Sequence, residues 1–151
     1  MRIDRIVAMS DLHLGYTAKA GLFLDFLDDV VAELGEDDVL VLCSDILEFW
    51  RRRNVDVLRE AEGLLEKLQR LKCRVVYVYG NHDVAMKELS LPGIPVVPSY
   101  RVNGLTFLHG QVVEALMLEL SPLDYEALAK LLCKMENFVG KVAEWLYAFF
   151  K

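Results

Sequence analysis

Four apolar runs recur along the chain, and each is followed at once by polar residues. The runs are rich in β-branched and aromatic residues and occupy 3–9, 39–43, 75–79 and 105–108. Near-continuous apolar runs of this length are typical of strands that are buried on both faces of a sheet. Ligands of open α/β sheets collect beyond the carboxyl ends of the strands. The pattern therefore predicts a sheet with a polar, functional edge.

Apolar residues at helical spacing lie between these runs. They predict one helix from a cap at Thr17 to Gly35 and a second helix over 55–71, so strands and helices alternate as in parallel βαβ units. A short helical piece ends at Leu89. The residues from 96 to 108 look antiparallel, because Asn-Gly between two β-type runs is a strong hairpin signal. We therefore expect an α/β fold with mixed sheets.

Length and charge narrow the class of protein. The 151 residues predict a single domain over 1–151, with a motif-bearing core over 1–111 and a helical segment over 112–151. The 17 basic and 23 acidic residues give a net charge of −6, which argues against a dedicated nucleic-acid surface. A phosphate substrate stays possible, because bound divalent metals would invert the local field.

The N-terminus and the cysteines indicate a cytoplasmic protein. Asp4 and Arg5 interrupt the first apolar run, which is not the pattern of a signal peptide, and no apolar stretch is long enough to be a transmembrane segment. The three cysteines are isolated from one another, at Cys43, Cys73 and Cys133. They read as reduced core residues rather than as disulfides or zinc ligands.

Five polar residues at the predicted strand ends form a candidate metal site. Each has an ordinary alternative, as a helix cap, a turn former or a hydrogen-bonded polar residue. Together they supply the carboxylate, imidazole and amide ligands that suit Mn²⁺, Fe or Zn²⁺. The five are Asp11, His13, Asp45, Asn81 and His109.

The same residues predict phosphoryl-transfer chemistry. Asp45 could bridge two ions, because a carboxylate has two oxygens. Two ions about 3.5–4 Å apart would clamp the attacking and leaving oxygens and generate a metal-bridging hydroxide. Next to Asn81, His82 would face the substrate and act as the catalytic histidine, and Asp83 would fix its tautomer and raise its pKa.

Four sequence blocks resemble the calcineurin-like metallophosphoesterase superfamily. They are Asp11-Leu12-His13, Ser44-Asp45-Ile46-Leu47-Glu48, Gly80-Asn81-His82-Asp83 and His109-Gly110. The resemblance covers residues 1 to about 111. Segments 10–14 and 47–50 are most similar to the branch that includes UDP-2,3-diacylglucosamine pyrophosphatase.

The resemblance implies an αββα sandwich that hydrolyses a phosphate ester, phosphodiester or pyrophosphate. One metal would take Asp11, His13 and Asp45, and the second would take Asp45, Asn81 and His109. His82 would contact the phosphate. We expect two divalent ions, with Mn²⁺ as first choice and Fe, Zn, Ni or Co as alternatives, and a phosphorylated small-molecule or lipid-like substrate.

Two departures from the family pattern stand out. Ser44 takes the place of a glycine, which is a mild change if serine tolerates the backbone angle there. The closing Gly-His-x-His block, which gives one histidine to each metal, is missing, and the chain's three histidines are all used already. Each ion would therefore lose one protein ligand. A C-terminally shortened, degenerate member that serves as a scaffold or interaction module is the alternative, as is an inactive fragment.

A long amphipathic helix is predicted in place of that block. It begins at Ser121-Pro122, a good helix start, and carries a heptad seam to the end of the chain. The seam could pack on the chain's own sheet, join two subunits or form a lid over an apolar group. Because the helix stops at Phe149-Phe150-Lys151 without a cap, we expect either a fragment or a homodimer that covers this end. The run 51–53 of three arginines could guide an anionic substrate or could simply be solvated.

Overall fold

The computed structural model describes residues 3–15 and 20–110, together with residues 121, 124, 127, 128, 130, 131, 134 and 135. The chain forms two compact units, Met1–His109 and Gly110–Lys151, which are described separately.

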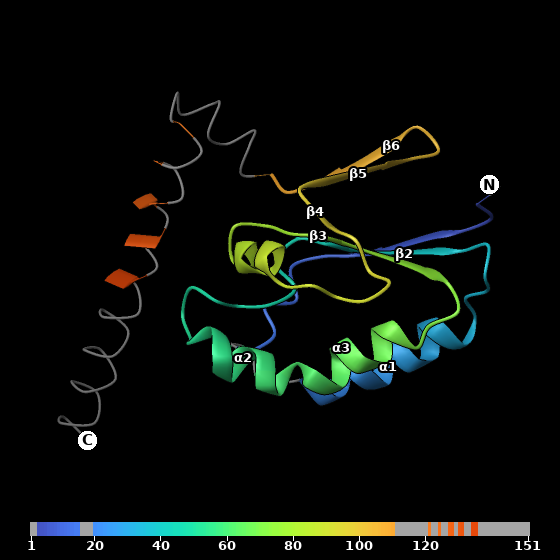
Figure 1. Cartoon of the computed structure of the whole chain (residues 1–151), viewed down its shortest axis with the longest axis horizontal. Helices are drawn as coiled ribbons and strands as arrows, with labels where there is room; N and C mark the ends of the chain where they lie inside the picture. The colour runs from blue at the N-terminus through green and yellow to red at the C-terminus, as the bar shows by residue number, and fades with distance from the viewer. Residues whose placement is uncertain are drawn as a thin grey trace, which may run out of the picture. The chain divides into compact units, whose positions relative to one another are not determined.

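A four-stranded parallel sheet is the centre of the first unit (Figure 1). Its strands are β1 (Ile6–Met9), β2 (Val39–Cys43), β3 (Arg74–Val78) and β4 (Val96–Val97), in the order β1-β2-β3-β4. Parallel pairing brings the carboxyl ends of β1, β2 and β3 to the same edge, as predicted.

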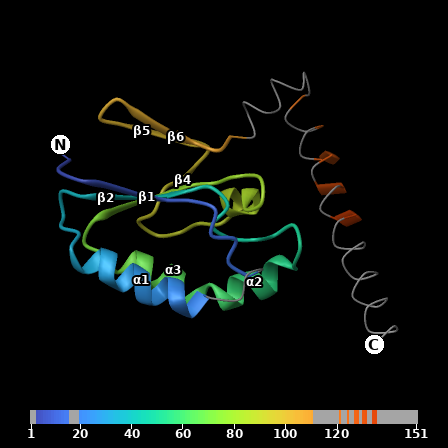
Figure 2. The same ribbon diagram turned by 180° about the vertical axis from the view of Figure 1, so that it is seen from behind.

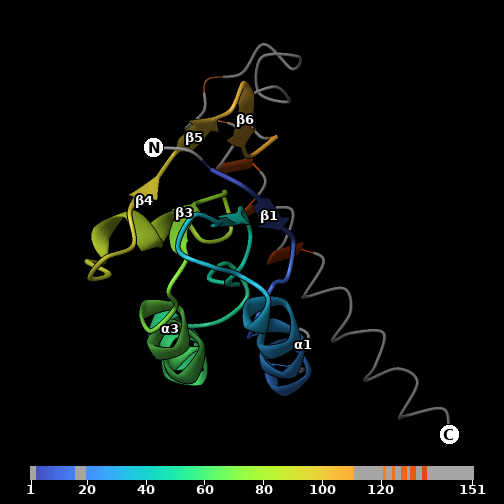
Figure 3. The same cartoon turned by 90° about the vertical axis from the view of Figure 1, so that its right-hand side faces the viewer.

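Helices cover one face of this sheet (Figures 1 and 3). They are α1 (Ala20–Ala32), α2 (Asn54–Glu60) and α3 (Glu62–Gln69), and a short 3₁₀ helix, η1 (Val84–Glu88), follows β3. The helix predicted over 55–71 is divided at Ala61. Backbone hydrogen bonds from Ala61 to Val57 and from Leu65 to Ala61 keep its two parts nearly continuous. The predicted cap at Thr17 lies outside the described residues.

A hairpin lies on the opposite face of the sheet (Figure 2). It consists of β5 (Ser99–Val102) and β6 (Leu105–Leu108), and its turn residues Asn103 and Gly104 have φ values of 48° and 80°. Two successive positive φ angles are the signature of a type I′ turn, so the hairpin prediction is confirmed.

The prediction that Val96 and Val97 belong to the antiparallel part was wrong. They form β4, which pairs parallel to β3. The 17 residues between Val78 and Val96, which include η1, are enough for a parallel crossover.

Two apolar layers pack on the two faces of the parallel sheet. Along β2, Leu40 and Leu42 belong to the cluster that contains Leu27 and Leu68 of the helices. Val39 and Val41 belong to the other cluster, against which the hairpin packs. This alternation is the period of two that strands impose, and it places apolar side chains on both faces of the sheet. Among the described cysteines, Cys43 and Cys73 are free thiols.

The second unit is described only at scattered positions. Ser121 Oγ accepts a hydrogen bond from the backbone N–H of Asp124 at 3.2 Å, as a helix cap does, and the described residues from 124 to 135 are helical. Of the predicted seam, Leu128, Leu131 and Met135 are described and exposed. The rest of the seam and the predicted end at 149–151 lie outside the described residues. No helix in the described part of the chain is long and apolar enough to cross a membrane.

Candidate active site

Backbone hydrogen bonds join the loops that follow β1, β2 and β3. The N–H groups of Asp11 and His13 donate to the carbonyl oxygens of Ser44 and Asp45, at 3.1 and 2.9 Å. The N–H of Phe49 donates to the carbonyl oxygen of His82 at 3.1 Å. These bonds extend the order of the sheet into the loops, so the polar side chains are held close together.

Four loop residues adopt a left-handed backbone conformation. The φ angles of Asp11, His13, Ser44 and Asp45 are 56°, 44°, 64° and 52°. Such angles cost of the order of 1 kcal/mol each in residues other than glycine, and they cluster at functional sites. Ser44 therefore stands in a conformation that favours glycine, so its replacement of glycine is a strained one.

Asp45 lies at the centre of the site and is 4% exposed. Its Oδ1 accepts a hydrogen bond from the N–H of His82 at 3.1 Å, and its Oδ2 lies 3.1 Å from Nε2 of His109. A side chain on Gly80 would place a Cβ 2.2 Å from Asp45 Oδ1. The glycine is therefore required for the carboxylate to occupy its position.

The first predicted ligand group is assembled. Asp11, His13 and Asp45 each offer a ligand atom, and these atoms lie within 4.8 Å of one another. Burial alone would raise the pKa of Asp45, but the hydrogen bond and charge of His109 outweigh it and lower that pKa. The hydrogen bond to Glu48 raises the pKa of His13 against the opposing effect of burial.

Asn81 provides the test of whether a metal fits. The residue is 6% exposed, and its buried Oδ1 has no hydrogen-bond partner among the described residues. A buried amide oxygen without a partner costs about 1–3 kcal/mol. An oxygen of this kind, at the end of β3 and in the loop that also bonds Asp45, fits a metal ligand.

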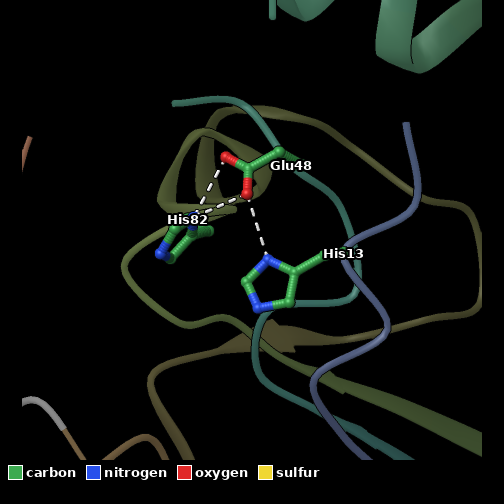
Figure 4. Close-up of side chains that lie close together, drawn as sticks. All are labelled: His13, Glu48 and His82. Carbon is green, nitrogen blue, oxygen red and sulfur yellow. Dashed lines mark hydrogen bonds and ion pairs between the residues drawn. The ribbon is translucent and has the colours of Figure 1, made fainter. Parts of the chain in front are cut away.

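Glu48 is a site residue for which we predicted no role from the sequence. The side chain is fully buried and lies between two histidines (Figure 4). Its Oε2 lies 3.1 Å from Nδ1 of His13 and 2.9 Å from Nδ1 of His82. Burial would raise the pKa of Glu48, but the hydrogen bonds from both histidines outweigh it and hold that pKa well below its usual range. The signal in the sequence was its place three residues after Asp45 in the same loop.

Asp83 does not hold His82 as predicted. Its buried carboxylate accepts hydrogen bonds from the hydroxyl of Tyr77 and the N–H of Gly80, both at 2.6 Å, and from the N–H of Ile46 at 2.9 Å. These bonds tie the loop after β3 to the loop after β2. Burial raises the pKa of Asp83. Glu48 takes the place beside His82 that we expected Asp83 to fill.

The arginine run is largely engaged by neighbouring acids. Arg52 makes a two-pronged ion pair with Glu60 at 2.7 and 2.6 Å, and Arg53 makes one with Asp56 at 2.7 and 3.2 Å. These pairs neutralise part of the charge that was considered as a guide for anionic substrates.

The chain is similar in sequence to a known protein family. A profile of the calcineurin-like phosphoesterase family matches residues 4–133. No curated protein matches the sequence. Among solved structures, the crystal structure of the Pseudomonas putida nuclease MPE is similar, with 27% identity and a TM-score of 0.48. The match covers 65% of this chain and 50% of the nuclease chain, so this chain spans about half the length of that protein. The match over residues 4–133 shows that the chain belongs to the calcineurin-like phosphoesterase family.

Proposed function

We propose that the protein is a metal-dependent phosphoesterase that hydrolyses a phosphate ester, phosphodiester or pyrophosphate with two divalent ions. The observation that carries the proposal is the buried Oδ1 of Asn81, which has no hydrogen-bond partner in the described part of the chain and lies at the same edge as the cluster of Asp11, His13 and Asp45. Buried polar oxygens in folded proteins nearly always have a partner, and a metal ion beside this cluster would supply one.

The ligands divide between the two ions around Asp45. Asp11, His13 and Asp45 would hold one ion, and Asp45, Asn81 and His109 would hold the other. Divalent ions bound there would offset the charge of the phosphate and activate water. Three protein ligands would remain for each ion without the Gly-His-x-His block, which leaves the other coordination positions to water and substrate. Mn²⁺ is the first ion to test.

His82 would contact the substrate. An ionised carboxylate can only accept hydrogen bonds, so Nδ1–H of His82 donates to Glu48 and Nε2 is the nitrogen that can face the phosphate. In the imidazolium form, Nε2–H can donate to a phosphoryl oxygen or to the leaving oxygen. Asp83 would support the reaction indirectly, because it fixes the backbone on both sides of the site.

The test combines metal content with hydrolysis of an aryl phosphate and an aryl phosphodiester in added Mn²⁺. The comparison is between wild type, Asp45→Asn and the surface control Asp56→Asn. Two ions per chain and turnover that only Asp45→Asn abolishes would support the proposal. No bound metal and no turnover above Asp45→Asn would refute it. That result would favour the second candidate function, a non-catalytic scaffold, which the missing Gly-His-x-His block also supports.

We also propose that two copies associate through the C-terminal helix. The support is the heptad spacing of apolar residues after Ser121. Light scattering at micromolar concentration tests this, and the mass of a monomer would disprove it.

A further inference from the structure

A tryptophan covers one face of the proposed catalytic histidine. The rings of Trp50 and His82 are stacked, with centroids 4.2 Å apart and planes inclined by 24°. The ring of His13 meets His82 edge-on, at 4.7 Å and 89°. Glu48 contacts Nδ1 of His82 at 2.9 Å. The imidazole is therefore contacted by a stacked ring, by a perpendicular ring and at one nitrogen.

The loop that carries Trp50 is bonded to the groups that it helps to arrange. Oε1 of Glu48 accepts hydrogen bonds from the backbone N–H groups of Trp50 and Arg51, at 2.9 and 3.2 Å. The N–H of Phe49 donates to the carbonyl oxygen of His82. The buried carboxylate of Glu48 thus holds both the backbone that carries the indole and the Nδ1–H of His82.

We propose that Trp50 is a positioning residue that fixes the ring plane of His82 for contact with the phosphate. The Nδ1 bond to Glu48 alone leaves the imidazole free to tilt about the axis of that bond. The indole removes this freedom, because tilting would break a stack of nearly parallel rings. Nε2 is then held in one direction. The inference rests on the proposed phosphoesterase function for its catalytic consequence, but the stack itself can be measured without turnover.

The first measurement uses the metal-free protein and its three histidines, which give a simple proton NMR spectrum of imidazole resonances. His82→Gln assigns the His82 signals. Stacking on an indole displaces these signals by ring current, so Trp50→Leu should return them toward the positions of an unstacked histidine. Trp50→Phe should keep part of the displacement. The matched control is Phe26→Leu, which removes an exposed aromatic ring from α1 and should leave all three histidines unchanged.

The second measurement is steady-state hydrolysis of an aryl phosphate in Mn²⁺. Loss of orientation should lower kcat of Trp50→Leu by about 10- to 100-fold, with little change in KM, and Trp50→Phe should recover most of it. Trp50→Met serves in the same way if Trp50→Leu does not fold.

The two measurements separate the possible failures. Unmoved His82 signals in Trp50→Leu would overturn the proposal, whatever the activity. Signals that move while kcat stays at the wild-type value would also overturn it, because the orientation would then have no catalytic use. A wild-type protein without turnover would refute the proposed function, and the NMR result would still decide whether Trp50 holds His82.

Discussion

Replacing Glu48 with glutamine tests the hydrogen-bond logic of the site most directly. The carboxylate accepts from Nδ1–H of both His13 and His82 and from two loop N–H groups. Because Nδ1 of His13 carries the proton, its Nε2 is the nitrogen that can offer a lone pair to a metal. Glutamine has the same shape, but one of its two terminal atoms is an NH₂ donor. The loop N–H groups require an acceptor, so the NH₂ must face the histidines.

An NH₂ group opposite Nδ1 changes the tautomer of the histidine that it meets. Nδ1 of His13 would have to accept, which moves the proton to Nε2 and blocks that nitrogen as a ligand. Loss of such an outer partner costs about 10- to 100-fold in metal affinity, which corresponds to about 1.4–2.7 kcal/mol. His82 can keep its Nδ1–H bond, because its Nδ1 also lies 3.0 Å from Oε1, which remains an acceptor. Turnover at saturating Mn²⁺ should therefore fall less than metal affinity does.

The assay measures Mn²⁺ affinity by calorimetric titration and kcat at saturating Mn²⁺. Glu60→Gln is the matched control, because Glu60 pairs with Arg52 at the surface and its ion pair contributes little. The reasoning is refuted if Glu48→Gln binds Mn²⁺ and turns over substrate as Glu60→Gln does, with the fold intact by circular dichroism.

Three further predictions concern the backbone and the titration of the site. Ser44→Gly should raise the free energy of unfolding by about 1 kcal/mol in urea titration, because φ is 64° there, and a less stable variant would contradict the strain. Gly80→Ala should abolish Mn²⁺ binding, because its Cβ would displace Asp45. The control Gly63→Ala, where a Cβ meets nothing within 4 Å, should bind Mn²⁺ normally. Normal binding by both variants would refute the steric argument. Burial lowers the pKa of His109, but the hydrogen bond to Asp45 outweighs it and raises that pKa above 6.5. The contribution of the His109–Asp45 pair to stability is therefore complete below pH 6.5 and is lost as pH rises through the folded-state pKa. The metal-free protein should therefore unfold at lower urea at pH 8.5 than at pH 6, and an equal loss in His109→Asn would speak against this pair as the cause.

The sequence predicted those parts of the structure that depend on local pattern. The strands around 39–43 and 75–79 and the hairpin turn at Asn103-Gly104 follow from apolar runs and turn chemistry, which act over a few residues. The parallel pairing of β4 could not be obtained in the same way, because a two-residue strand carries almost no periodicity and its partner is chosen by the crossover.

The difference between local and long-range contacts also explains why Glu48, and not Asp83, is the partner of His82. Asp83 is the neighbour of His82 in sequence, which made it the obvious partner. Adjacent side chains point in different directions, however, and Asp83 turns toward N–H groups of another loop. Glu48 reaches His82 only because parallel strands bring two loops together. Contacts of this kind depend on the packed fold and leave no local signature.

The residues with left-handed backbone conformation make the loops of the site easier to unfold locally than the sheet beneath them. The amides of Asp11 and His13 are held by bonds to the loop after β2 rather than by the sheet, and both residues carry backbone strain. Local unfolding begins where strain is high and burial is incomplete, so these amides exchange with solvent before those of β2, whose first four residues are buried. An ion bound by the same side chains would add its binding energy where the loops are strained. Metal supply would then determine how long the loops stay closed while the sheet beneath them remains unchanged.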